Sequence, residues 1–264
     1  ADVILTVDIS RLNVYVDKGL LLPINSTKLF KNIPSHLRGP NNDWFAFSQR
    51  ARMLAVKIAR VSSKKIKKIE DLANPNWRGR ICSRPGSHVY NRALLASIIA
   101  HNGELVAQKW AKSLVDNLAQ RPQGNDRAQV KAVFQGVCDI AIINSYYFGK
   151  LRNSKITEQR EWTKNVRIVF TNQTGRGNHI NISGGGVAKY SKNKKLAVKF
   201  LEFLSEEKAQ KLFTKINFEF PANPSISHSK ELLSWGAFSE DKLPISKIAE
   251  LAPLAQRIID RVGW

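Results

Sequence analysis

Segments with the pattern of a buried strand alternate along this chain with segments that have the pattern of an amphipathic helix. Apolar, β-branched runs typical of buried strands occur at residues 2–8, 44–60, 79–83, 139–143 and 167–171. Helix patterns occur at residues 11–18, 69–77, 89–102, 104–119, 127–135, 193–204 and 206–214, and Asp126 is predicted to cap the helix 127–135. This alternation predicts an α/β fold.

The length of the chain, 264 residues, allows either one large domain or two lobes with separate cores. No apolar run approaches the roughly 20 residues of a membrane-spanning helix. The chain opens at Ala1-Asp2 and enters a strand at once, so we expect no signal peptide in it. Because a signal is removed from a mature exported protein, this start is compatible with a location outside the cytosol.

The charge of the chain is strongly positive, with 42 Lys and Arg against 21 Asp and Glu. This balance suggests nucleic acid, an anionic ligand or an acidic surface as a partner, or simply an organism whose proteins are basic. The basic residues are scattered apart from one cluster at residues 64–68, and the sequence has no RNP-like motif, zinc finger or long basic tail. We therefore do not expect a nucleic-acid partner, and nucleic-acid binding is a distant alternative prompted by charge alone.

The sequence contains none of the common enzyme signatures. There is no GxxxxGK[ST], HExxH, GxSxG or GxGxxG, and no two of the five histidines stand four residues apart. The run Gly184-Gly185-Gly186 could approach a phosphate, but a tight crossing of chains is the favoured interpretation. We therefore predict a binding protein and not an enzyme.

The two cysteines, Cys82 and Cys138, belong to no CxxC pair, which argues against a structural zinc site. They lie on strands that can be neighbours, and one disulfide between them can form in an oxidising compartment. Two buried free thiols are the alternative.

The tyrosines are few, and their distribution is informative. Two of the five, Tyr146 and Tyr147, are adjacent at the carboxyl end of the strand 139–143, and Tyr90 follows the strand 79–83 and its turn. In open α/β sheets, ligands bind outside the carboxyl ends of the strands. Three phenols from two neighbouring loops can therefore converge on one cleft.

A cluster of phenols suits few ligands. A tyrosine with a pKa near ~10 is neutral at pH 7, but a hard, highly charged cation can displace the proton and bind the phenolate oxygen. Fe(III) is the common biological cation of this kind, whereas calcium and magnesium favour carboxylates and carbonyls, and zinc favours His and Cys. Paired aromatic residues also serve as packing or as a platform for a sugar, and the tyrosines alone leave these alternatives open.

At these residues the chain resembles the periplasmic ferric-iron-binding proteins of bacterial ABC importers, the Fbp/Fut group of extracellular solute-binding proteins. The most specific matching elements are NSYY at residues 144–147 and GRGNHINISG at residues 175–184. The resemblance covers nearly all of the chain, with further matching stretches at residues 1–8, 48–52, 70–81, 89–91, 124–130, 138–143 and 220–224.

The resemblance implies a two-lobed α/β binding protein of type II with mixed sheets, which closes over its ligand like a hinge. It implies that Tyr90, Tyr146 and Tyr147 bind Fe(III), and that Arg50 lies near the metal to balance charge or to hold an anion. Arg50 could otherwise be a surface cation on the strand 44–60. The implied function is capture of ferric iron in the periplasm for delivery to the permease of an inner-membrane ABC importer. A related binding protein for a small anion or organic solute, held by Arg50 and the glycine-rich loop, is the alternative.

The family pattern also differs from this chain at its start. Members usually have a strand and a helix before the element that matches residues 1–8, and that segment supplies ligands from the first lobe. We therefore expect an incomplete first lobe, or a swapped dimer in which a partner chain fills the gap. The expected lobes are residues 1–55 with about 168–222, and about 56–167 with 223–264.

Overall fold

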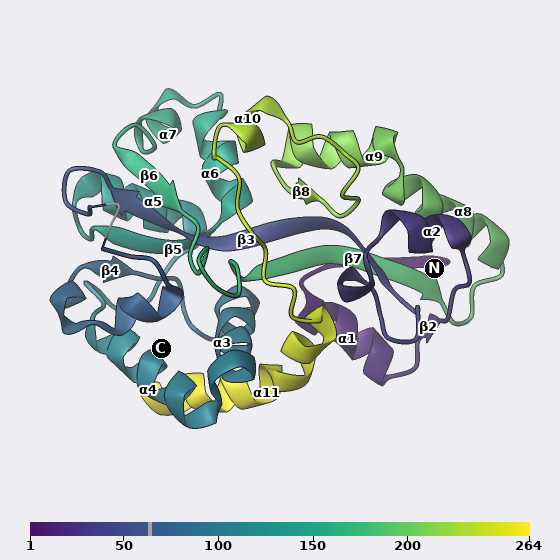
Figure 1. The fold of residues 1–264 in the computed structure, drawn as a ribbon, viewed down its shortest axis with the longest axis horizontal. Helices are drawn as coiled ribbons and strands as arrows, with labels where there is room; N and C mark the ends of the chain where they lie inside the picture. The colour runs from purple at the N-terminus through teal and green to yellow at the C-terminus, as the bar shows by residue number, and fades with distance from the viewer. Residues whose placement is uncertain (63–64) are drawn as a thin grey trace. The chain divides into compact units, whose positions relative to one another are not determined.

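The structure is a computed structural model that describes residues 1–62 and 65–264 (Figure 1). The described residues form two compact units. Unit 1 comprises Ala1–Arg50, Asn181–Gly236 and Leu243–Glu250, and unit 2 comprises Ala51–Ile180, Ala237–Lys242 and Leu251–Trp264. Lys64, from the basic cluster 64–68, lies outside the described residues. No helix within the described residues has the length and apolar character needed to span a bilayer.

The lobes expected from the sequence stay a prediction. They differ from the two units in residues 51–55 and 168–180, which group with unit 2, and in residues 223–236 and 243–250, which group with unit 1. Three elements contribute residues to both units, namely β3 (Phe45–Lys57), β7 (Ile180–Ala188) and α11 (Ile245–Val262).

Unit 1 is built on short antiparallel strand pairs. β1 (Val3–Val7) and β2 (Leu21–Leu22) pair with β7, and the first part of β3 pairs with β8 (Phe220–Pro221). The helices of this unit are α1 (Ile9–Asp17), α2 (Thr27–Asn32), α8 (Lys194–Ser205), α9 (Glu207–Leu212) and α10 (Lys230–Leu233), with a π-helical turn at Phe213–Asn217 and a 3-10 turn at Ser35–Leu37.

The glycine run 184–186 lies inside β7, where neighbouring backbones come close. A Cβ atom on Gly184 would lie 2.5 Å from the carbonyl oxygen of Phe45, and one on Gly185 would collide with the carbonyl oxygen of Ile4. Any side chain would push these strands apart, so the run permits close backbone approach on both sides of β7. The tight crossing expected from the sequence is confirmed.

Unit 2 contains a mixed sheet covered by helices. The second part of β3 runs antiparallel to β5 (Ile140–Asn144) and β6 (Val166–Val169), and β5 runs parallel to β4 (Ile81–Cys82). Every residue of β5 is buried, which explains why this strand reads as a continuous apolar run. The helices of this unit are α3 (Val89–Asn102), α4 (Glu104–Asp116), α5 (Asp126–Gln135), α6 (Ser145–Arg152), α7 (Thr157–Glu161) and the end of α11 (Figure 1).

Two helix predictions need correction. The helix expected at residues 69–77 is a pair of 3-10 helices, Ile69–Ala73 and Pro75–Trp77, interrupted at Asn74. The helix expected to reach residue 119 ends at Asp116. Asn117 follows it, and its side chain donates to the carbonyl oxygens of Leu72 (2.9 Å) and Asn74 (2.8 Å), which ties the helix end to the 3-10 pair.

The two cysteines form a disulfide in unit 2. Cys82 ends β4, and Cys138 lies just before β5, the parallel neighbour of β4. Their Cα atoms are 5.8 Å apart, a usual separation for a bridged pair. Of the two alternatives that the sequence left open, the structure contains the bonded form.

Candidate metal centre

The three predicted tyrosines lie in the first turns of two helices of unit 2. Tyr146 and Tyr147 follow Ser145, where α6 begins directly after β5. Tyr90 is in the first turn of α3, where the His88 ring nitrogen accepts a hydrogen bond from the backbone N–H of Tyr90. Because β4 and β5 run parallel, both helices start at the same edge of the sheet. The predicted placement beyond the carboxyl ends of two neighbouring strands is confirmed.

The three phenols converge. The hydroxyl oxygens of Tyr90 and Tyr146 are 3.1 Å apart and share a hydrogen bond. The rings of Tyr146 and Tyr147 lie 4.3 Å apart between centroids, tilted by 31°. Two oxygen ligands bound at about 2 Å to one small hard cation lie roughly 2.8–3.3 Å apart when they are neighbours in its coordination shell. The separation of the Tyr90 and Tyr146 oxygens falls in that range.

The environment of Tyr146 keeps its phenol neutral when no cation is bound. Burial raises the pKa of Tyr146 far above the ordinary value of 10.0, and the adjacent phenols of Tyr90 and Tyr147 raise it further through charge and hydrogen bonding. A cation placed at the shared oxygens would have the opposite effect, because it attracts the phenolate form. The cluster is therefore a site where binding of a highly charged cation is coupled to loss of protons.

Each of the three phenol rings faces a positively charged side chain. Measured to the ring centroid, the guanidinium carbon of Arg84 lies 5.2 Å from Tyr90, that of Arg127 lies 5.5 Å from Tyr147, and the ammonium of Lys150 lies 5.3 Å from Tyr146. These cations favour negative charge on the rings. The spacing of residues along the sequence did not identify these three cations as part of the site. Arg127 does lie within residues 124–130, one of the stretches that resemble the ferric-iron-binding proteins.

The role predicted for Asp126 is wrong. Asn125 caps α5, since its side-chain oxygen accepts from the backbone N–H groups of Arg127 and Ala128. Asp126 is fully buried and forms ion pairs with Arg52 (2.6 Å) and Arg84 (3.2 Å). Burial lowers the pKa of Arg52, and the charge of Asp126 opposes that shift.

Arg50 belongs to unit 1 and is 1% exposed, so it is not the surface cation that the sequence left as an alternative. Its guanidinium donates to the hydroxyl of Ser183 (3.1 Å) and lies 3.6 Å from the carboxylate of Asp8, which is buried as well. The carboxylate of Asp8 also accepts from Ser10 at the start of α1 and from Asn181. A role for Arg50 beside a metal or an anion stays a prediction.

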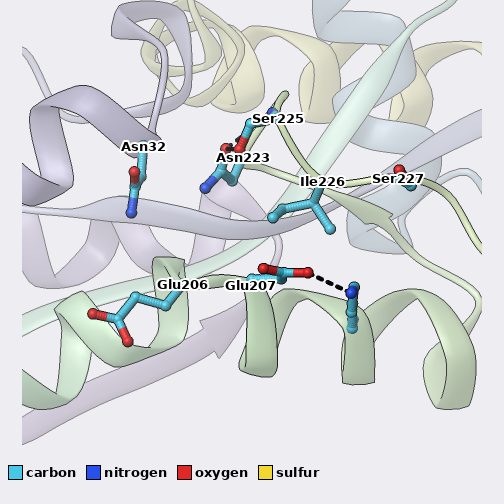
Figure 2. A pocket seen from close by; sticks show the side chains of 8 residues that line it. Asn32, Glu206, Glu207, Asn223, Ser225, Ile226 and Ser227 are labelled. Carbon is cyan, nitrogen blue, oxygen red and sulfur yellow. Dashed lines mark hydrogen bonds and ion pairs between the residues drawn. The ribbon is translucent and has the colours of Figure 1, made fainter.

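A polar hollow of about 500 Å³ in unit 1 offers a second candidate (Figure 2). Its carboxylates already have partners, because Glu207 pairs with Lys211 and Glu206 pairs with Lys28 (2.6 Å). The other lining residues are Asn32, Asn223, Ser225, Ile226 and Ser227. This hollow therefore presents nearly balanced charge, whereas the tyrosine cluster presents convergent ligand oxygens.

Conventional metal ligands do not compete with the tyrosines in the described part of the chain. Among residues 1–62 and 65–264, no group of three or more His, Cys, Asp or Glu side chains is arranged to hold a metal ion.

The fold is that of a known class of binding protein. Residues 1–239 match the model of the bacterial extracellular solute-binding protein family, and the chain belongs to that family. The expected α/β fold of the type II solute-binding proteins is thereby confirmed.

Particular relatives within this family are named for iron. The chain is 39% identical to iron uptake protein A1 of Synechocystis sp. over 264 residues, which are 100% of this chain and 73% of that protein. Among solved structures, Trichodesmium FutA (IdiA) in complex with iron and citrate ligands is 42% identical, with a TM-score of 0.98 over 100% of this chain and 84% of that one. The ferric binding protein from Campylobacter jejuni is also 42% identical, with a TM-score of 0.94 and the same coverage.

Proposed function

We propose that this protein captures Fe(III) through the phenolate oxygens of Tyr90, Tyr146 and Tyr147. The observation that carries the proposal is the 3.1 Å separation of the Tyr90 and Tyr146 oxygens, with the ring of Tyr147 4.3 Å from that of Tyr146. Three phenolates would offset the charge of Fe(III), and the cations over the rings would stabilise them. The relatives named for ferric iron support the choice of metal.

The site binds and releases its ligand and needs no catalytic group. We propose that the protein works in the periplasm and delivers ferric iron to the permease of an ABC importer in the inner membrane. The family description, an extracellular solute-binding protein, supports this location. The disulfide between Cys82 and Cys138 supports it as well, because such bonds persist in oxidising compartments.

The test is to add ferric citrate to metal-free protein and record the visible spectrum. Phenolate bound to Fe(III) gives a charge-transfer band, and capture releases protons that a weakly buffered indicator detects. Tyr147→Phe removes one phenolate and lowers iron affinity by more than about tenfold. Tyr190→Phe is the matched control, because Tyr190 is 80% exposed and lies in unit 1.

Two results would contradict the proposal. A colourless protein in the presence of ferric citrate would count against phenolate coordination. An unchanged spectrum in Tyr147→Phe would remove that residue from the ligand set. Binding of citrate or phosphate without iron would instead favour the alternative of a small-anion-binding protein.

A further inference from the structure

A buried carboxylate joins three segments of unit 2. One oxygen of Asp126 accepts from a guanidinium nitrogen of Arg52 at 2.6 Å and from the backbone N–H of Asn144 at 2.7 Å. Its other oxygen accepts from Arg84 at 3.2 Å. These donors belong to β3, to the last residue of β5 and to the turn after β4, so three segments that are distant in sequence meet at one side chain.

Two of these segments lead directly to the tyrosines. Asn144 is followed by Ser145 and then by Tyr146 in α6. The second terminal nitrogen of Arg52 donates to the side-chain oxygen of Asn91 at 2.5 Å, and Asn91 is the residue after Tyr90. The amide nitrogen of Asn91 donates in turn to the turn after β4, at distances of 3.0–3.3 Å. A short path of hydrogen bonds therefore runs from one phenol-bearing helix start to the other through Asp126.

We propose that Asp126 is a positioning residue, which fixes the separation of the Tyr90 and Tyr146 oxygens through Arg52 and Asn144. The inference rests on the proposed function for the identity of the bound ion. Ligands of one metal ion must be held to within about 0.5 Å by groups that are themselves fixed. Charge-assisted hydrogen bonds are the short and strong ones, and Asp126 and Arg52 are 0% and 2% exposed.

The sequence pattern explains why this carboxylate is available. Asn125 supplies the cap of α5, so Asp126 is not needed there. Its position in the first turn places it at the positive end of the helix dipole, which stabilises a carboxylate. The two arginines provide the remaining countercharge, and the second terminal nitrogen of Arg52 extends the network to Asn91, the residue after Tyr90.

The test compares Asp126→Asn with Asp139→Asn in the full chain. Both changes remove one nearly buried carboxylate of unit 2 from its arginine partners, since Asp139 is 4% exposed and pairs with Arg80 (2.7 Å) and Arg60 (3.7 Å). Asp139 precedes the first residue of β5, whereas the tyrosine pair follows its last residue. With about 3.3 Å per residue, Asp139 and Asn144, which are five residues apart, are separated by roughly 16 Å. The control therefore reproduces the loss of a buried ion pair away from the phenols.

Three readouts are taken for each variant: unfolding by denaturant, amide hydrogen exchange of the metal-free protein, and ferric iron affinity with its visible band. We expect Asp126→Asn to speed exchange in peptides covering residues 88–92 and 144–148. We also expect it to lower iron affinity by about 10- to 100-fold and to shift the band, as changes to groups that orient metal ligands do. Asp139→Asn should leave exchange in those peptides and iron affinity within about twofold of the wild type.

Arg52→Lys provides a second route if Asp126→Asn does not fold. It keeps the charge next to Asp126 but cannot also reach Asn91, so it should shift the band and weaken iron binding in the same direction. The proposal is overturned if the folded variants bind iron as the wild type does, or if Asp139→Asn has the same effect as Asp126→Asn. A wild-type protein that binds no iron would refute the proposed function alone, and the exchange comparison would still decide whether Asp126 positions the two tyrosine segments.

Discussion

Reduction of the disulfide should weaken unit 2 by an amount that follows from its loop. The bond joins residues 56 apart in sequence, Cys82 and Cys138. In the chain-entropy account, a link across a loop of that length removes about 14 cal/mol/K from the unfolded chain, which is about 4 kcal/mol at 25 °C. This is a large part of the 5–15 kcal/mol that typically separates folded from unfolded domains.

The assay uses the same polypeptide in its oxidised and reduced forms, so that no side chain changes in volume. Unfolding by urea is followed by tryptophan fluorescence, which reports mainly on unit 2 because four of the six tryptophans, Trp77, Trp110, Trp162 and Trp264, belong to it. The midpoint should fall on reduction, and the slope with denaturant should rise because the reduced chain exposes more surface when unfolded. Mass before and after alkylation confirms the redox state.

The reasoning would be refuted by a loss of less than about 1 kcal/mol with an unchanged slope. That result would mean that the unfolded chain holds the two cysteines close together without the bond. Two free thiols in the purified, non-reduced protein would refute the bond itself.

Three further predictions concern other parts of the chain. Burial lowers the pKa of His228 below 6.5, so the folded state disfavours its charged form. The free energy of unfolding should therefore be retained above about pH 6.5 and should decline as the pH falls below it. His228→Asn should flatten that decline in urea unfolding between pH 7 and 5. Gln210 is fully buried and makes four hydrogen bonds to backbone groups, so Gln210→Ala should cost about 2–4 kcal/mol of unfolding free energy. A Cβ on Gly86 would lie 2.6 Å from the ring of Trp264, so Gly86→Ala should cost about 1–3 kcal/mol and perturb Trp264 fluorescence.

Each of these predictions has a control and a contrary outcome. The profile of His228→Asn must differ in slope from the wild type, and parallel profiles would assign the pH dependence to other groups. Lys211→Ala, at the exposed neighbour of Gln210, should have a small effect, and an equal loss in both variants would contradict the role of the buried amide. Ser87→Ala beside Gly86 is the control for the steric argument, which fails if Gly86→Ala unfolds like the wild type.

Much of the fold could be predicted from hydrophobic periodicity, because the strongest patterns are compatible with only one type of secondary structure. The helix expected at residues 89–102 has the same limits in the structure, and the strand expected at residues 44–60 is β3 (Phe45–Lys57). The helices expected at residues 69–77 and 104–119 have other limits in the structure, and the physical cause is long-range hydrogen bonding. Asn117 ends α4 by binding a segment about 45 residues earlier, and local propensity carries no trace of that contact.

The candidate site was partly predictable for the same reason. A tyrosine pair at the end of a buried strand indicates a position at the carboxyl edge of the sheet, and the structure places Tyr146 and Tyr147 there. The buried ion pairing of Asp126 could not be predicted, because aspartate is both a common helix cap and a common partner in buried ion pairs. Only the packing of Arg52 and Arg84 around it decides between these uses.

The division of unit 1 along the sequence affects how the chain is made. Residues 1–50 leave the ribosome 130 residues before the segment that begins at Asn181, since residues 51–180 lie between them. At 5–20 residues per second, that delay is about 7–26 s. During this time β1 has not met β7, the strand with which it pairs from Val3 to Val7. The edge of β1 that pairs with β7 therefore stays open for those seconds, and whatever receives the nascent chain must keep that edge from pairing with another copy.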